Sequence, residues 1–432
     1  MKVTFIKPNM TDRRSPDSLP PLAIAALAAQ TPPEVEREFY DEGIERLPTD
    51  LETDLAAISV HTTFSARRSY ELADGFRRRG IPVVMGGYHP SLIPDEALEH
   101  ADAVVKGPAE NLWAQVLQDA RQRRLSRLYE DTGHQAVLRA GYDMSLFKRK
   151  PYNPIFPVEF TRGCLYDCDF CTVSIFNKRR LCCRPVEDVL ADIGRARSRT
   201  MFIVDDNILS NRPQARKLFQ ALIPLKIKWG CQISIDIARD PEMLALMARS
   251  GCILFIIGFE SLRGGNLDQM HKGSHRSDAE YPAYIERIRD QGIMIYASFV
   301  LGYDFDTPDI FDETLEFALK HKFILANFNT LNPMPGTRLY ERLKSEGRLL
   351  VDPWWLHEYH YGEVSFLPRQ MTPEQLKEGC IRARAGFNSA SGIAKRLLDF
   401  RANCRSPHHL AVFLAMNFVA RREIRAKMKL IK

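Results

Sequence analysis

The amino-acid sequence predicts an α/β protein with an amino-terminal doubly wound, Rossmann-like domain, a partial (β/α)6 TIM barrel and a helical carboxy-terminal region. Three observations support this fold class. Short apolar runs alternate with helix-length segments through the first 140 residues, and the alternation resumes after residue 155 with six strand-helix units. Between these regions, 141–150 is polar and without periodicity, and Pro151, Pro154 and Pro157 follow it. The predicted domains therefore span 1–140, 141–345 and 346–432.

The composition is that of soluble globular material. The chain has 432 residues, 45% hydrophobic and 26% charged, which is enough for two or three domains with cores and excludes a disordered or fibrous protein. The apolar run at the amino terminus is too short for a signal peptide, and no stretch approaches the roughly 18 apolar residues of a membrane span. Nine cysteines, none before Cys164, do not resemble a disulfide framework, so a reducing, cytoplasmic location is expected.

The first domain is expected to alternate strands and helices around an open parallel sheet. Ligands on such sheets lie at the carboxyl ends of the strands. Three loops follow predicted strands there: 59–63, 86–90 and 107–110. The glycines of the second and third loops let the backbone approach a large flat ligand, and the Ser and Thr hydroxyls of the first can bond its polar edges, although Gly-Gly is more often simple turn chemistry. Strands are expected at 2–7, 35–41, 55–60, 82–85 and 103–105, and helices at 22–30 and 67–79.

A cysteine loop follows the linker and the apolar run 155–160. Cys164, Cys168 and Cys171 are spaced Cys-x3-Cys-x2-Cys, so their thiolates can converge on one metal centre and leave a fourth position without a protein ligand. The alternatives are cysteines that are simply buried, or a zinc site that recruits Cys182 or Cys183. The barrel elements come next, with helices at 185–195, 212–222, 241–250, 278–290 and 311–320 and strands at 201–204, 228–235, 253–258, 293–302 and 326–331.

The cysteine loop resembles that of the radical S-adenosylmethionine (SAM) enzymes, whose core is a partial (β/α)6 barrel. The resemblance implies that the three cysteines hold a 4Fe-4S cluster, that SAM binds the fourth iron, and that Phe170 packs near the adenine. Asp205-Asp206-Asn207 stands where many of these enzymes carry Gly-Gly-Glu to hold the SAM amino group, a match by position and not by identity. A helix cap or a salt bridge is the alternative for each acidic residue. The resemblance also places Gln232 and Glu260 toward the ribose and Leu301 beside the adenine.

The first domain in turn resembles the amino-terminal cobalamin-binding domain of the cobalamin-dependent radical SAM family. Pro108 departs from that family, which often has Glu there, and the Asp-x-His-x-x-Gly signature of other cobalamin proteins is absent. The resemblance therefore allows a cobalt without a histidine ligand, and a histidine bonded to a loop carbonyl or a cobalamin side chain is the simpler reading of His61 and His89. The implied cofactor-binding residues are Ser59, His61, Thr62, Thr63, Gly86, Gly87, Tyr88, His89, Gly107 and Glu110.

The family resemblance implies an enzyme that cleaves SAM to a 5'-deoxyadenosyl radical and methylates an unactivated carbon of a small or lipid-like intermediate. It also implies an electron donor such as flavodoxin or ferredoxin. Ring formation or oxidation without methyl transfer stays open, because one fold hosts several reactions. A methylthiotransferase would need further cysteines in the first domain, where the sequence has none, and a zinc-binding scaffold is the non-enzymatic alternative.

The last region combines aromatic and basic residues. The aromatic run 354–361 is expected to pack on the barrel or to shape a substrate pocket. An apolar helix at 410–420 leads into a basic tail, a pattern typical of a docked helix or of peripheral membrane contact. No aromatic-interleaved basic motif supports nucleic-acid binding.

Overall fold

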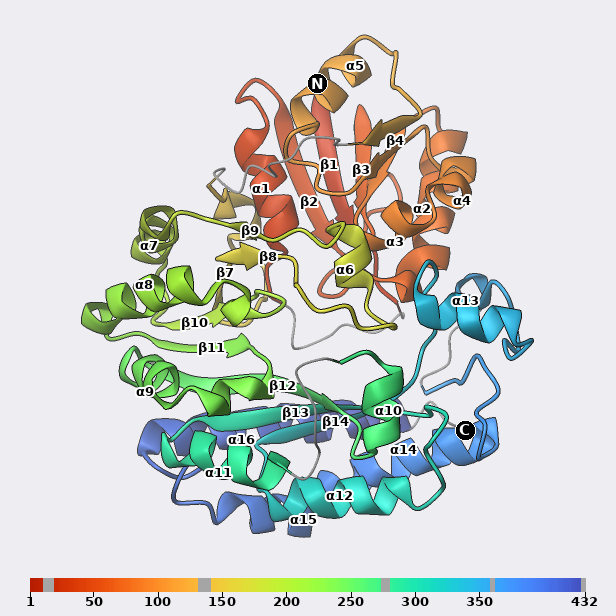
Figure 1. Cartoon of the computed structure of the whole chain (residues 1–432). Coiled ribbons are helices and arrows are strands. Elements are labelled where there is room, and N and C mark those ends of the chain that lie inside the picture. The colour runs from red at the N-terminus through yellow and green to blue at the C-terminus, as the bar shows by residue number, and fades with distance from the viewer. Residues whose placement is uncertain (11–18, 131–140, 273–279, 358–361, 429–432) are drawn as a thin grey trace.

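The computed structural model describes residues 1–10, 19–130, 141–272, 280–357 and 362–428. Two parallel sheets form the framework, with the first sheet above the second in Figure 1 and the cysteine loop between them. This arrangement confirms the predicted fold class. No helix in the described part of the chain is long and apolar enough to cross a membrane.

The first sheet has six parallel strands in the order β2-β1-β3-β4-β5-β6. One face packs against α1 (Leu22–Gln30) and α5 (Trp113–Arg121), and the other against α2 (Ala66–Arg78) and α4 (Pro94–His100). The sequence prediction missed β6, because it has three residues and only Tyr129 among them is buried. The strands are β1 (Lys2–Lys7), β2 (Glu36–Asp41), β3 (Leu55–Ser59), β4 (Val83–Gly86), β5 (Ala103–Lys106) and β6 (Leu128–Glu130), and a short helix α3 (Tyr88–Leu92) follows β4.

The second sheet is the open barrel, with six parallel strands in the order β14-β13-β12-β11-β10-β7. Alternate side chains of β12 to β14 are buried against the outer helices, while the others face the barrel interior. The strands are β7 (Phe156–Val158), β10 (Thr200–Ile203), β11 (Lys228–Gln232), β12 (Cys252–Glu260), β13 (Met294–Leu301) and β14 (Leu325–Thr330). The outer helices are α7 (Val186–Arg195), α8 (Arg212–Leu222), α9 (Pro241–Arg249), α11 (Tyr281–Asp290) and α12 (Ile310–Lys320).

Short elements frame the cysteine loop. The hairpin of β8 (Thr161–Arg162) and β9 (Cys182–Cys183) encloses it together with α6 (Thr172–Phe176). Gly163 has φ +94°, and a Cβ there would stand 2.0 Å from the carbonyl oxygen of Arg180, so only glycine fits. Two further helices lie near the loop, α10 (Gly264–Gln269) and α13 (Arg338–Ser345).

The carboxy-terminal region contacts both domains. Trp354 and Trp355 pack on the first domain and also on the segment after the last barrel strand, where the indole N–H of Trp354 donates to the carbonyl of Pro333 and Trp355 lies beside Tyr340. Residues 358–361 of the aromatic run lie outside the described residues. Helix α14 (Pro373–Phe387) packs along α12 and β14. Helices α15 (Ala390–Leu397) and α16 (Pro407–Met428) cover the amino ends of the barrel strands, where Arg396 and Asn417 donate to backbone carbonyls at 323–324.

Candidate functional site: a cysteine loop between two cofactor cavities

The three cysteines of the loop are free thiols and are half-buried. Burial raises the pKa of all three thiols, that of Cys168 to about 12, and Cys164 further raises the pKa of both Cys168 and Cys171, so the thiols are neighbours. The ammonium of Lys272 lowers the pKa of Cys164 and Cys168. Among the described residues, no three Cys, His, Asp or Glu side chains converge as a site for a single metal ion. Neighbouring thiols on one loop beside a cation fit an anionic iron-sulfur cluster.

Two aspartates after β10 hold the backbone of this loop. Asp205 is 2% exposed, and its carboxylate accepts hydrogen bonds of 2.8 Å from the backbone N–H groups of Phe160 and Thr161 and one of 2.7 Å from the Thr161 hydroxyl. Asp206 accepts from the N–H of Gly163 at 3.1 Å. Asn207 uses its side-chain oxygen to cap the next turn through the N–H of Leu209. The two carboxylates therefore position the cysteine loop.

The far end of the loop is fixed from the other side of the barrel. The hydroxyl of Tyr303, just after β13, donates to buried Asp169 at 2.8 Å. Arg179 and Arg338 both pair with Asp167, at 2.7 and 3.0 Å. Contacts from three separate segments thus constrain the loop on which a cluster would sit.

The other predicted SAM contacts are spread over the barrel mouth. Glu260 has φ +65° and pairs with Lys272, which also donates to the carbonyl of Gly258 at 2.7 Å. Gln232 is exposed at the carboxyl end of β11. Leu301 is fully buried in the core, and its neighbour Val300 lines the cavity beside the cysteine loop instead.

That cavity has a volume of about 430 Å³ and borders the third cysteine. Phe170 lines it, as the resemblance implies, and Phe64 reaches it from the first domain. Apolar and amide side chains make up much of the rest of the wall, which suits an organic ligand with few charges. Its lining includes Phe64, Phe170, Cys171, Val300, Asn329, Leu331, Asn332, Met334 and Arg384.

A second cavity, of about 360 Å³, lies between the first sheet and the cysteine loop. Gly87, with φ +107°, could not carry a Cβ, which would stand 2.5 Å from the carbonyl oxygen of Val60. Gly107 has φ +84° and open space where its Cβ would be. These glycines let the backbone border a large ligand closely, so the cavity fits part of a cobalamin. Seven predicted residues line it, namely Ser59, His61, Gly86, Gly87, Tyr88, Gly107 and Glu110, and the barrel adds Glu159, Thr161, Arg162, Phe176, Val204 and Asp206.

The two histidines of the first domain lie in different environments. His89 is fully buried and lies within 3.0 Å of the Tyr70 hydroxyl, 3.3 Å of Glu96 and 3.4 Å of the Thr63 hydroxyl. It is therefore part of the core beneath the loops, as is Thr63, while Thr62 caps the turn that follows it. His61 lines the cavity, and its Nε2 atom is buried without a hydrogen-bond partner in the described structure.

Sequence reasoning missed Arg162, which joins the two domains. Its guanidinium pairs with Glu110 of the first domain at 2.7 Å and with Glu159 at 3.0 Å, while Tyr142 donates to Glu159. These opposite charges raise the pKa of Arg162 although burial opposes them. Its place two residues before Cys164 could have marked it, but nothing in the local sequence shows that it faces the other domain.

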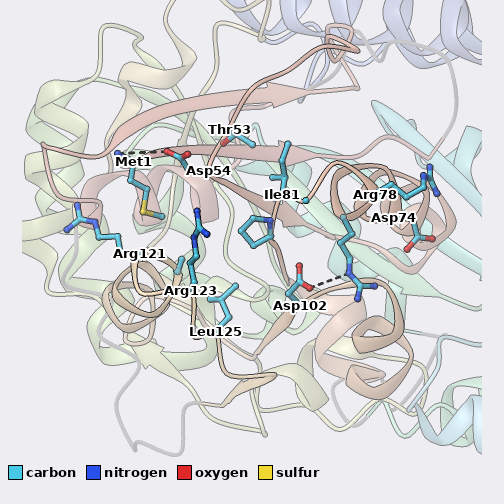
Figure 2. Close-up of a pocket in the computed structure, with 14 residues that line it drawn as sticks. Met1, Thr53, Asp54, Asp74, Arg78, Ile81, Asp102, Arg121, Arg123 and Leu125 are labelled. Carbon is cyan, nitrogen blue, oxygen red and sulfur yellow. Dashed lines mark ion pairs between the residues drawn. The ribbon is translucent and has the colours of Figure 1, made fainter.

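A third cavity, of about 1190 Å³, lies at the opposite end of the first sheet. Residues that precede the strands line it, and two ion pairs cross it, the Met1 amino group with Asp54 and Arg77 with Asp102 (Figure 2). Open α/β sheets bind their ligands at the carboxyl ends of the strands. We therefore take the two cavities beside the cysteine loop as the candidate functional sites.

Comparisons with known proteins agree with this geometry. The model of the radical SAM superfamily matches residues 158–318, and that of the B12 binding domain matches residues 18–117. Two relatives from Chlorobaculum tepidum are each 29% identical: bacteriochlorophyllide d C-12(1)-methyltransferase, over 83% of this chain and 80% of that protein, and bacteriochlorophyllide d C-8(2)-methyltransferase, over 77% and 78%.

A solved structure supports the same fold. The radical SAM methyltransferase TsrM from Kitasatospora setae, with cobalamin and a [4Fe-4S] cluster bound, superposes with a TM-score of 0.65 at 15% identity, over 80% of this chain and 75% of that one. The matched domains, the cysteine loop and the two cavities agree with one another. The chain therefore combines a B12-binding domain with a radical SAM domain, the pairing found in cobalamin-dependent radical SAM enzymes, and these domains imply a 4Fe-4S cluster, SAM and cobalamin as its cofactors.

Proposed function

We propose that this enzyme methylates an unactivated carbon of a flat, largely apolar substrate of the tetrapyrrole class. The observation that carries the proposal is the 430 Å³ cavity beside Cys171, which both domains line with mainly apolar and amide side chains. The two relatives named for bacteriochlorophyllide methylation support the substrate class. When bound, the cluster and SAM supply a hydrogen-abstracting radical and cobalamin supplies the methyl group.

The chain's own residues contribute position and exclusion of water. Asp205, Asp206 and Tyr303 fix the cysteine loop relative to the barrel. Arg162 fixes it relative to the first domain through Glu110. Because both cavities border this one loop, groups bound in them would be held in fixed relative positions, which is the main contribution a protein makes to such chemistry.

The test is an anaerobic reaction of the reconstituted enzyme with SAM carrying a trideuterated methyl group, a reductant, and a chlorophyllide with an ethyl side chain. Mass spectrometry of the tetrapyrrole is expected to show the gain of one labelled methyl group, with formation of 5'-deoxyadenosine. The variant Cys168→Ala is expected to lose both products. Deoxyadenosine without a labelled tetrapyrrole would favour ring formation or oxidation and refute methyl transfer to this class.

We further propose that the electron comes from a flavodoxin or ferredoxin that docks at the outer side of the cysteine loop. Leu165, within the loop, is 63% exposed. The exposed side chains of Arg179 and Arg338 lie nearby, paired with Asp167. An apolar side chain beside exposed arginines suits an acidic redox partner.

We also propose peripheral contact with a membrane surface through α16. Leu410, Leu414 and Phe418 are 37%, 49% and 70% exposed and repeat every four residues, so they lie on one face of the helix. Arg422 and Arg425 follow them and are exposed. An apolar face that continues into exposed cations suits an anionic lipid surface.

A further inference from the structure

We propose that His61 supplies an imidazole nitrogen to the cobalt of bound cobalamin as an axial ligand. The inference rests on the family assignment, which provides the cofactor, and on the position of His61 in the cavity between the two domains. It assigns a metal ligand to a chain whose sequence does not contain the histidine signature of other cobalamin proteins.

The first argument concerns one nitrogen of the His61 imidazole. Its Nε2 atom has no hydrogen-bond partner in the described structure. Buried polar side-chain atoms in folded proteins are nearly always paired, so an unpaired nitrogen in the wall of a cofactor cavity indicates a partner that arrives with the cofactor.

The second argument is that several other polar groups around this cavity are already paired. The indole N–H of Trp113 donates to the Thr31 hydroxyl at 2.8 Å and has no lone pair to offer a metal. Arg162 is a paired cation, and Glu110 is one of its partners. His89 does not line the cavity and is held by Tyr70 and Glu96.

The third argument is the charge state of the ring. Burial, together with the Lys7 ammonium, lowers the pKa of His61 to about 4, although the Asp41 carboxylate opposes them. Lys7 and Asp41 end the neighbouring strands β1 and β2. His61 is therefore neutral at physiological pH, and a neutral imidazole is the form that binds metals.

The fourth argument is topological. In cobalamin proteins with the Asp-x-His-x-x-Gly signature, that motif brings the histidine to cobalt. Here the stretch 8–21, between β1 and α1, contains no histidine in its sequence. Strand β3 lies next to β1 in the sheet, and His61 follows β3. The loop after β1 contains no histidine. The loop after β3 lies at the same edge of the sheet and contains His61, which has the imidazole nitrogen that a cobalt ligand requires.

The experiment is electron paramagnetic resonance of the full chain reconstituted with hydroxocobalamin and reduced to the Co(II) state. A coordinated ¹⁴N splits the cobalt hyperfine lines into triplets. We expect triplets in the wild type, doublets when the protein is labelled with ¹⁵N-histidine, and unsplit lines in His61→Gln. Free ¹⁵N-imidazole added to His61→Gly is expected to restore the doublets.

Three results would overturn the proposal, and they differ from one another. Triplets that persist with ¹⁵N-histidine would assign the nitrogen to the cofactor's own base. Unsplit lines in a cobalt-loaded wild type would show that His61 does not bind the metal, and would leave the family assignment intact. A wild type that takes up iron but no cobalamin would refute the cofactor assignment itself. His89→Gln is not a suitable control because His89 belongs to the core. Glu187→Gln, an exposed substitution outside the cavity, serves instead and should keep the wild-type splitting.

Discussion

The contacts of Asp205 in the folded protein give information about its role that its position in the sequence does not give. Its position after a barrel strand predicts a contact with SAM, whereas its buried carboxylate is surrounded by donors from Phe160 and Thr161. Burial raises the pKa of Asp205 to about 8, although these donors lower it. A local sequence pattern could not distinguish the two roles, because the residues that contact Asp205 lie 44 and 45 positions away.

The raised pKa of Asp205 gives a prediction about stability and pH. A carboxyl that holds its proton more tightly when folded contributes stability that is present below its unfolded pKa of about 4 and is lost as the pH rises through about 8. Wild-type unfolding midpoints in urea should therefore fall between pH 5 and pH 8, and Asp205→Asn should reduce that slope. The exposed control Glu187→Gln should keep the wild-type slope. An unchanged slope in Asp205→Asn would contradict the prediction.

At the scale of elements, the segment around Trp354 and Trp355 connects the end of the barrel to the first domain. The indole N–H of Trp355 donates to both carboxylate oxygens of Glu96, at 2.9 and 3.1 Å, and that of Trp354 donates to the carbonyl of Pro333 at 2.8 Å. Trp354 also packs against Phe64, with ring centroids 5.1 Å apart, and Phe64 lines the cavity beside the cysteine loop. The segment therefore supports a wall of the proposed substrate site.

Substitutions of Trp355 should separate its hydrogen bond from its packing. Trp355→Phe keeps an aromatic ring but removes a bond to a carboxylate, which should cost about 2 kcal/mol. Trp355→Ala also leaves a cavity and should cost about 4 kcal/mol. Urea denaturation of both variants, with Glu96→Gln and the double variant Glu96→Gln/Trp355→Phe, forms a cycle that isolates the bond. A coupling energy near zero in that cycle would show that the contact does not contribute.

At the scale of the whole molecule, the two domains meet around the cysteine loop and the last helices close the other end of the barrel. Arg162 and Trp355 join the domains from two sides, so both cavities are bordered by groups held from more than one part of the fold. Helix α16 turns Phe413 and Asn417 inward and Leu414 and Phe418 outward. The exposed face is thus available to a partner while the helix remains docked.

The membrane proposal predicts a difference between lipid compositions. The wild type should co-sediment with vesicles rich in phosphatidylglycerol and much less with phosphatidylcholine vesicles, and added salt should weaken the binding. Leu414→Glu/Phe418→Glu should lose most of the bound fraction. Val351→Glu, at another exposed apolar position, should not. If the double variant binds like the wild type, or instead converts a dimer to a monomer in sedimentation velocity, lipid is not what α16 contacts.

The sequence by itself determined the two parallel sheets, the barrel and the three cysteines, because periodicity and motif spacing are local properties of the chain. It also placed seven of the residues that line the cavity of the first domain, since they follow predicted strands. Only the tertiary structure showed that His61 lines the cavity whereas His89 lies in the core. It also showed that Arg162 pairs with Glu110 and that Trp355 bonds to Glu96. Those contacts join residues 52 and 259 positions apart, and burial and charge pairing over such separations are decided by packing, not by neighbours in the sequence.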